Sequence, residues 1–121
     1  MNLVEITTDK FDLTIDLIYF TANNFTNKPV YKSDKCLIHK DAITPLQNAI
    51  KLSRSLGYKL KIFDAFRPSD AQWVLWRHTP DPNFLADPRT GSPHSRGVAV
   101  DLTLINIKNE ELDMGTGFDE F

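Results

Sequence analysis

The segment from Ser92 to Ile107 constrains this chain more than any other, because it joins a histidine-bearing loop to the most apolar strand pattern. Val98 to Ile107 alternates in a way that predicts a strand. Asp101 lies inside this run, seven residues after His94. A lone carboxylate in an apolar strand is costly unless it is paired or coordinated. The pattern therefore predicts either a strand with one solvated face or half of a metal site.

The rest of the chain mixes helices and strands without strict alternation. The apolar stripe from Ile43 to Leu56 predicts a helix that Asp41 or Thr44 caps and Gly57 ends. The other expected elements are strands at Val4–Thr7 and Tyr58–Phe63, a strand or extended segment at Phe11–Phe20, an extended piece at Val30–Tyr31, a helix over Asp70–His78 capped by Ser69, a loop over Thr79–Pro93, and a return strand at Leu112–Met114. This order predicts an α+β fold with a small mixed or antiparallel sheet and two main helices.

Composition limits the class of protein. A chain of 121 residues with 41% hydrophobic and 25% charged residues is expected to form one small ordered domain. Its net charge of −2 argues against nucleic-acid or anionic-membrane partners. The single cysteine, Cys36, excludes an internal disulfide and is expected to be buried and inert. With no signal peptide and no spanning segment expected, a cytoplasmic location is the prediction.

Three residues could carry chemistry. His94 and Asp101 could converge from a loop and the adjacent strand as half of a zinc site, with Gly97 allowing the backbone to turn between them. A surface histidine and an outward-facing aspartate are the alternatives. Arg67 directly follows a predicted strand, where it could bind a carboxylate or stabilise an oxyanion. An ion pair with a neighbouring aspartate, Asp64 or Asp70, is its alternative.

The spacing Ser92-x-His94-x-x-Gly97-x-Ala99-x-Asp101 resembles the zinc motif of the D-alanyl-D-alanine dipeptidases of the vancomycin-resistance type. Further segments resemble that family in the family's own order: the stretch from Asp16 to Tyr31, Asp64-Ala65-Phe66-Arg67-Pro68, and Met114-Gly115-Thr116-x-Phe118-Asp119. The resemblance covers almost the whole chain and implies a compact cytoplasmic α+β enzyme that hydrolyses D-Ala-D-Ala in cell-wall precursor metabolism.

The resemblance also implies roles for individual residues. His94 and Asp101 match two of the three ligands of one zinc ion, and Arg67 matches the arginine that stabilises the tetrahedral intermediate. The positions that match substrate-binding residues are Ser92, Asp119, Tyr19 and Tyr31, of which Asp119 is suited to the ammonium group of the dipeptide.

The chain departs from the family pattern in one respect. The family carries a Glu-x-Trp-His motif that supplies the general base and the third zinc ligand, and this motif is absent here. We therefore expect residues 1–121 to form the N-terminal two thirds of a dipeptidase domain, with an incomplete zinc site and an exposed edge beside the Val98–Ile107 strand. Two alternatives follow: a hydrolase completed by a second polypeptide that carries Glu-x-Trp-His, or an inactive remnant that at most binds peptides or self-associates.

Overall fold

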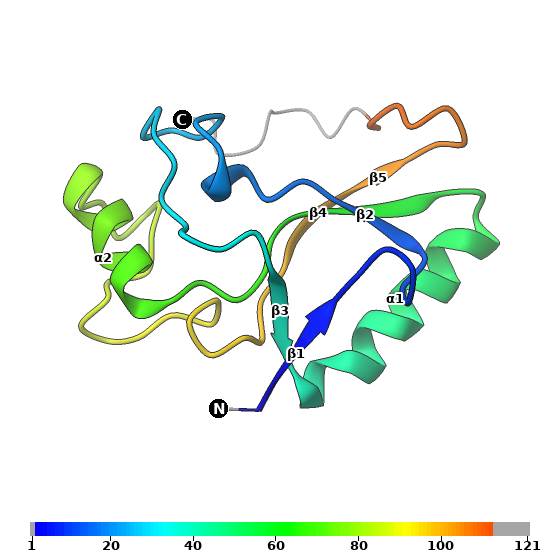
Figure 1. Cartoon of the computed structure of the whole chain (residues 1–121), viewed down its shortest axis with the longest axis horizontal. Coiled ribbons are helices and arrows are strands. Elements are labelled where there is room, and N and C mark those ends of the chain that lie inside the picture. Colours follow the sequence, from blue (N-terminus) through cyan, green and yellow to red (C-terminus); the bar gives the residue numbers. More distant parts are fainter. Residues whose placement is uncertain (1, 113–121) are drawn as a thin grey trace.

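The computed structural model describes residues 2–112 as two small β-sheets with the two α-helices at opposite ends (Figure 1). The elements are β1 (Leu3–Ile6), β2 (Leu13–Ile15), η1 (Ile18–Phe20), β3 (Cys36–His39), η2 (Lys40–Ala42), α1 (Ile43–Ser55), β4 (Lys59–Asp64), α2 (Ser69–His78) and β5 (Asp101–Ile105). The expected α+β class and the two main helices are confirmed.

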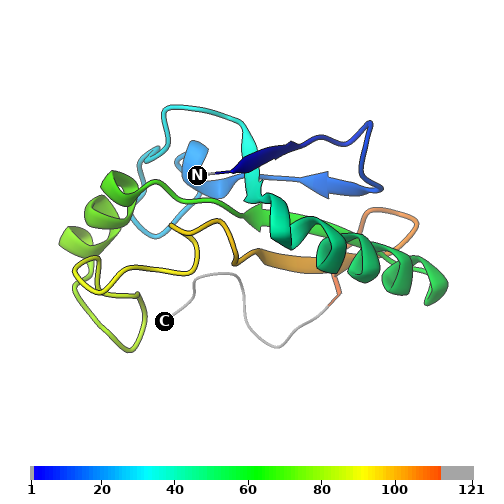
Figure 2. The same ribbon diagram turned by 90° about the horizontal axis from the view of Figure 1, so that it is seen from below.

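The strands form one two-stranded and one three-stranded sheet. Strands β1 and β3 pair antiparallel. In the larger sheet β4 is central, with β2 parallel on one side and β5 antiparallel on the other. Figure 2 shows β5 on the side of β4 that lies away from β2. The mixed sheet expected from the sequence is therefore present, and its central strand ends at Asp64.

Helix α1 forms where its apolar stripe predicts it. Leu46 and Ile50 on this stripe are buried against residues of both sheets, including Ile38 and Ile62. Gly57 follows the helix with a φ of +84°, a conformation that glycine adopts without steric strain. This main core joins α1 to the sheets and holds β4 in place.

A second apolar cluster anchors α2. Leu75 on this helix is fully buried with Tyr19 and Phe63, and Leu85 from the following loop joins them. Two of the residues that the sequence places near the site, Tyr19 and Tyr31, belong to this cluster or pack against it. The cluster thus ties α2, η1 and the end of β4 together beside the candidate site.

Several local predictions were wrong. The Phe11–Phe20 run is a strand only over β2, because it then turns into the 3₁₀ helix η1. The extended piece expected at Val30–Tyr31 lies outside the strands, and both of its backbone N–H groups donate to the Tyr19 carbonyl. Strand β3 was not predicted. Neither expected side-chain cap forms, because α1 follows directly on η2 and α2 starts after Pro68.

Strand β5 begins at Asp101 rather than at Val98. Its odd-numbered side chains are the ones that face the interior. Thr103 and Ile105 are buried, whereas Leu102 is 40% exposed. Asp101 shares the parity of Thr103 and Ile105 and is partly buried. The outward-facing alternative for Asp101 is therefore wrong. Of the expected return strand at Leu112–Met114, residues 113 and 114 lie outside the described residues, and the Leu112 N–H donates to the Leu104 carbonyl beside a bridge between Ile105 and Glu111.

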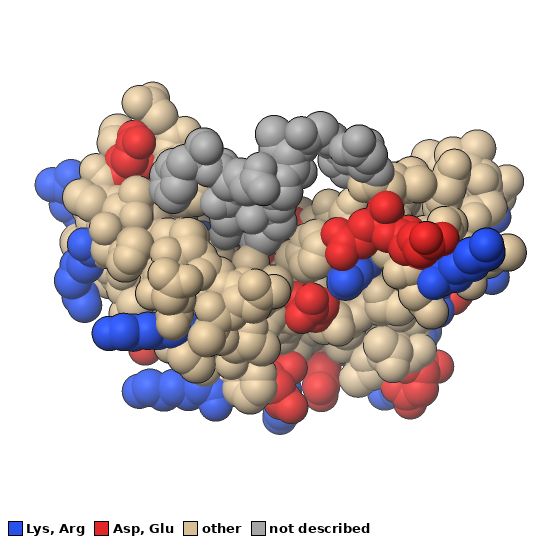
Figure 3. Space-filling view, turned by 90° about the horizontal axis from the view of Figure 1, so that it is seen from above, with Lys and Arg blue, Asp and Glu red and all other residues tan. Residues whose placement is uncertain are grey.

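Charged side chains of both signs lie beside one another on the face shown in Figure 3. Among the ion pairs of the molecule, Lys61 Nζ lies 3.0 Å from Glu111 Oε2 and 4.0 Å from Asp16 Oδ2. Such exposed pairs contribute little stability. Within residues 2–112, no helix has both the length and the apolar character needed to span a bilayer.

Candidate active site

The candidate site lies where β4 ends and β5 begins. Asp64 pairs with Asp101 across these strands, whereas Ile62 pairs with Leu102, so Phe63 is an extra residue in the ladder. Such a bulge reorients the side chains that follow it. Here it places two carboxylates opposite each other, an arrangement that is unfavourable without a cation beside them.

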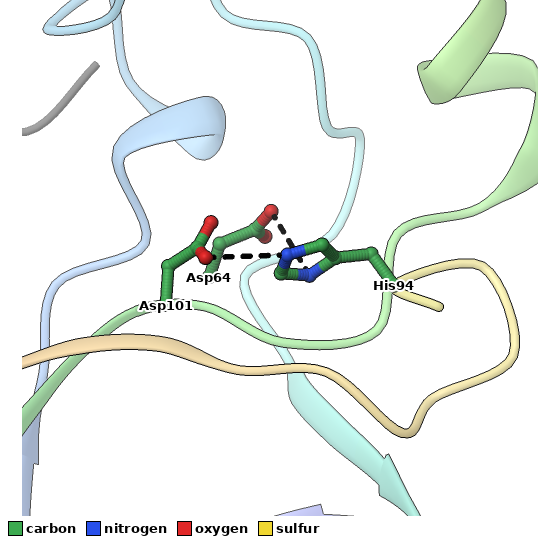
Figure 4. Close-up of side chains that lie close together, drawn as sticks. All are labelled: Asp64, His94 and Asp101. Atoms are coloured by element: carbon green, nitrogen blue, oxygen red, sulfur yellow. Dashed lines mark ion pairs between the residues drawn. The ribbon is translucent and has the colours of Figure 1, made fainter. Parts of the chain in front are cut away.

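His94 enters this site from the preceding loop with its ring held in place (Figure 4). Its Nδ1 lies 2.8 Å from the Ala65 carbonyl oxygen, and its own carbonyl accepts a hydrogen bond from Arg67 N at 3.0 Å. A ring that donates from Nδ1 to a carbonyl leaves Nε2 for a ligand or acid–base role. That Nε2 lies 3.3 Å from Asp101 Oδ1. The side chain of His94 is 14% exposed, so the surface alternative is wrong.

The pKa of His94 reflects two opposing effects. Burial of the ring, the largest single effect, lowers this pKa, whereas the hydrogen bond to Asp101, the negative charge of Asp101 and the hydrogen bond to the Ala65 carbonyl together raise it by more. The net pKa therefore lies above its usual range. The carboxylate of Asp101 and the imidazole of His94 thus form a strongly interacting pair even without a metal ion.

Gly97 makes the turn between the two candidate ligands, as expected. Its φ is +75°, and a Cβ atom at this position would lie 2.9 Å from Leu3 Cδ2 and 3.0 Å from His39 N. The Gly97 carbonyl accepts a hydrogen bond from His39 N at 2.8 Å. The loop that carries His94 is therefore docked closely on β3, and only glycine fits at the point of contact.

The sequence analysis did not identify Asp64 as a site residue and named it only as a possible ion-pair partner of Arg67. Its side chain is fully buried. Oδ1 accepts a short hydrogen bond from the Tyr31 hydroxyl, and Oδ2 accepts from Arg67 Nη2 at 2.7 Å and Nε at 3.1 Å. Burial raises the pKa of Asp64, and the positive charge of Arg67 opposes that rise. The available signal was the spacing Asp64-x-x-Arg67 at a strand end.

Arg67 lies between the two carboxylates. Its Nη2 is 2.7 Å from Asp64 Oδ2 and 4.0 Å from Asp101 Oδ2, and its side chain is 5% exposed. The guanidinium also stacks over the Tyr19 ring, with Cζ 5.2 Å from the ring centroid. The ion-pair alternative for Arg67 is therefore correct for Asp64, and the same guanidinium still faces Asp101.

The remaining candidates contact the site in different ways. The Tyr19 ring lies under the Arg67 guanidinium, and the Tyr31 hydroxyl donates to Asp64. The centroids of the two rings are 5.9 Å apart. Burial raises the pKa of Tyr31 above its usual range, so its hydroxyl stays a hydrogen-bond donor. Ser92 is 2% exposed, and its Oγ accepts a hydrogen bond from His94 N at 3.2 Å. Asp119 lies outside the described residues.

Within residues 2–112, one group of three side chains has ligand atoms close enough to hold a metal ion. The ligand atoms of Asp64, His94 and Asp101 lie within 4.8 Å of one another. Both oxygens of Asp64 are already bonded to Tyr31 and Arg67, and Asp64 faces the Nδ1 side of His94. His94 Nε2 and the Asp101 carboxylate contact each other, and a nitrogen with an oxygen donor is a combination that zinc accepts. The three residues therefore form a possible metal site, in which Asp64 is the member already engaged by Tyr31 and Arg67.

The comparison with known families settles the class of the chain. The model of peptidase family M15, described as D-Ala-D-Ala dipeptidase, matches residues 1–121. The chain belongs to this family. The resemblance seen in the sequence is thus confirmed.

Relatives with established names agree with this assignment. The chain is 48% identical over 119 residues to the D-alanyl-D-alanine dipeptidase of Escherichia coli (strain K12). This alignment covers 98% of this chain and 62% of that protein. It is 34% identical over 128 residues to the enzyme of that name from Streptomyces coelicolor, and 31% over 125 residues to that from Enterococcus faecalis. Each of these alignments covers 86% of this chain and 62% of the relative. The chain thus spans 62% of the length of these relatives.

Proposed function

We propose that this chain contributes the metal-binding and oxyanion-binding part of a zinc hydrolase that cleaves D-Ala-D-Ala. The observation that carries the proposal is the convergence of His94 Nε2 and the Asp101 carboxylate beside the Arg67 guanidinium, which lies 4.0 Å from Asp101 Oδ2. A family whose named relatives are D-alanyl-D-alanine dipeptidases supplies the substrate class.

Each residue has a defined part in this proposal. His94 and Asp101 hold the zinc ion, which supplies Lewis acidity at the scissile carbonyl when bound. Arg67 donates its guanidinium N–H groups to the oxygen that becomes negative as the carbonyl is attacked. Tyr19 lies under that guanidinium and fixes its plane. Because Arg67 is buried and already oriented, it needs little reorganisation as that charge develops.

Ser92 and Asp119 complete the proposed substrate contacts. Ser92 lies at the base of the His94 loop, where its hydroxyl holds the His94 backbone. Asp119 would bind the ammonium group of the dipeptide. We further propose that Tyr31 acts through Asp64, because its hydroxyl donates to that carboxylate.

A complete catalytic set also needs a general base and a third zinc ligand. We propose that a Glu-x-Trp-His segment of the kind known in the family supplies both, either from further sequence or from a second polypeptide. Two ligands should bind zinc more weakly than three, and an absent base should reduce the rate by roughly 10²–10⁴-fold. The side of β5 away from β4 is the proposed place for such a segment, because within residues 2–112 this side carries no strand of the sheet and only the bridge from Ile105 to Glu111.

The test is zinc-dependent release of D-alanine from D-Ala-D-Ala by the 121-residue chain, alone and with a peptide that contains Glu-x-Trp-His. Binding of Co²⁺, followed by its absorption spectrum, gives a readout that does not require turnover. We expect His94→Ala and Asp101→Ala to abolish both signals. His78→Ala changes an exposed histidine on α2 and serves as the matched control.

The outcomes separate the alternatives. Hydrolysis that needs the added peptide would support a completed enzyme. Dipeptide binding without hydrolysis under either condition would instead support the inactive peptide-binding alternative. Hydrolysis or Co²⁺ binding that survives His94→Ala would contradict the proposed site.

A further inference from the structure

We infer that Gln72 is a positioning residue for Arg67, an inference that rests on the proposed function. Gln72 lies on α2 and is 1% exposed. Its Oε1 accepts a hydrogen bond from Arg67 Nη1 at 2.7 Å, and its Nε2 donates to the Ala86 carbonyl at 2.7 Å. Both ends of this buried amide are therefore hydrogen-bonded, as buried polar groups generally are, and one of the two partners is the candidate oxyanion-binding residue.

The hydrogen bonds of Arg67 to Asp64 leave a specific freedom that Gln72 removes. Both Nε and Nη2 of Arg67 donate to the same oxygen, Asp64 Oδ2. Because both bonds end on one acceptor atom, they restrain the guanidinium at one edge only, while the Tyr19 ring restrains its plane. The bond from Nη1 to Gln72 is a second point of attachment on the far side of the group. Together the two points fix which N–H groups remain for a developing oxyanion.

The orientation of the Gln72 amide is itself determined by its neighbours. Arg67 offers only donors, so it requires the amide oxygen. The Ala86 carbonyl is an acceptor, so it requires the amide nitrogen. Reversing the amide would oppose donor to donor at Arg67 and acceptor to acceptor at Ala86. The side chain therefore has one favourable orientation, as a positioning role demands.

Gln72 also connects Arg67 to the loop that carries the other candidate substrate residue. Ala86 lies in the loop between α2 and Ser92. Gln72 and Ser92 line the same small cavity of about 20 Å³. Gln72 thus holds both the Arg67 guanidinium and the loop that leads to Ser92. Through these two bonds Arg67 and Ser92 keep a fixed position relative to each other.

The first test measures the Arg67 side chain directly in the 121-residue chain by ¹⁵N–¹H NMR of the guanidinium. We expect the Nη1 protons of Arg67 to give resolved signals, because the bond to Gln72 restricts rotation about Cζ–Nη1. In Gln72→Leu these signals should merge or broaden, while the Nε–H signal held by Asp64 persists. In Gln72→Glu they should stay resolved, because a carboxylate oxygen still accepts from Nη1. Gln47→Leu, at an exposed position on α1, is the matched control.

The second test uses the zinc-loaded chain, supplemented with the Glu-x-Trp-His peptide if hydrolysis requires it. A misplaced Arg67 should lower kcat by roughly 10²-fold in Gln72→Leu with little change in KM, and less in Gln72→Glu. A loss of activity that matches the loss of folded protein would indicate a structural role and overturn the inference. Unchanged Nη1 signals in Gln72→Leu would overturn it even if the wild-type chain proves inactive, an outcome that would count against the proposed function alone.

Discussion

At the scale of single residues, the site depends on a buried charge pair rather than on exposed catalytic groups. Asp64 has no exposed surface, and Arg67 is 4% exposed. A buried ion pair is strongly destabilised when one partner is removed, because the other charge stays buried without compensation. The pair therefore links the stability of the fold to the geometry of the proposed oxyanion-binding group.

Asp64→Asn should lower the free energy of unfolding by roughly 3–5 kcal/mol, because the buried Arg67 would lose its nearest counter-charge and keep only Asp101, at 4.0 Å. Urea unfolding followed by tryptophan fluorescence measures this change. The control is Asp87→Asn, which removes the partner of Arg89 from an exposed pair. Since Arg89 is 69% exposed, that variant should unfold close to the wild-type midpoint. Equal effects of the two substitutions would contradict the buried-pair argument.

Cys36 offers a second prediction about a single residue. Burial raises the pKa of its thiol to about 12. The native protein should therefore not react with iodoacetamide at pH 8, whereas the urea-unfolded protein should react fully. The unfolded thiol ionises at a lower pH than the folded one, so this group should reduce stability as pH rises from about 9 toward 12. Rapid labelling of the native thiol at pH 8 would show that Cys36 is accessible.

The residues found and missed from sequence differ in what determines their role. His94 and Asp101 stand in one short segment, so the spacing suggested both as candidates beside the surface alternatives, and the family resemblance then favoured the ligand interpretation. Asp64 was missed as a site residue because its position opposite Asp101 depends on a bulge at Phe63 between two strands far apart in the chain. Gln72 was missed because its role arises only from its contact with Arg67.

At the scale of elements, regular local patterns were predictable and short pairings were not. Helix α1 follows from its apolar stripe and Gly57, within one residue of the expected end. Strand β3 has only four residues and follows a polar stretch, so its existence depends on pairing with β1. Strand β5 is shorter than its apolar pattern, because the chain before it still belongs to the His94 loop, in which Val98 N donates to the Pro93 carbonyl and Gly97 contacts β3.

The docking of that loop can be tested at Gly97. Gly97→Ala should destabilise the protein more than Gly57→Ala, although both glycines have positive φ values of +75° and +84°. At Gly57 nothing lies within 4 Å of the added Cβ, so only the backbone strain of roughly 1–2 kcal/mol applies. At Gly97 the new atom also meets Leu3 and the backbone of His39. Urea unfolding compares the two variants, and equal losses would show that the loop can move away without penalty.

At the scale of the whole molecule, the site joins the separate parts of the fold. β4 contributes Asp64, β5 contributes Asp101, and a loop docked on the smaller sheet contributes His94. The second apolar cluster, through Tyr19, supports Arg67 from the other side. Composition and periodicity predicted the fold class, but this convergence depends on contacts between sheets that no local pattern encodes.

A ligand that joins parts of a fold stabilises the whole fold, so zinc should raise the thermal midpoint of the 121-residue chain in a concentration-dependent manner. At a free zinc concentration 100 times Kd, the expected gain is about 2.7 kcal/mol. The thermal midpoint, measured by circular dichroism across a zinc titration, gives this gain. His94→Ala and Asp101→Ala should each abolish the shift, and His78→Ala should retain it. A shift that persists in both site variants would place the metal elsewhere, and a chelator that leaves the midpoint of the zinc-loaded protein unchanged would argue against metal binding altogether.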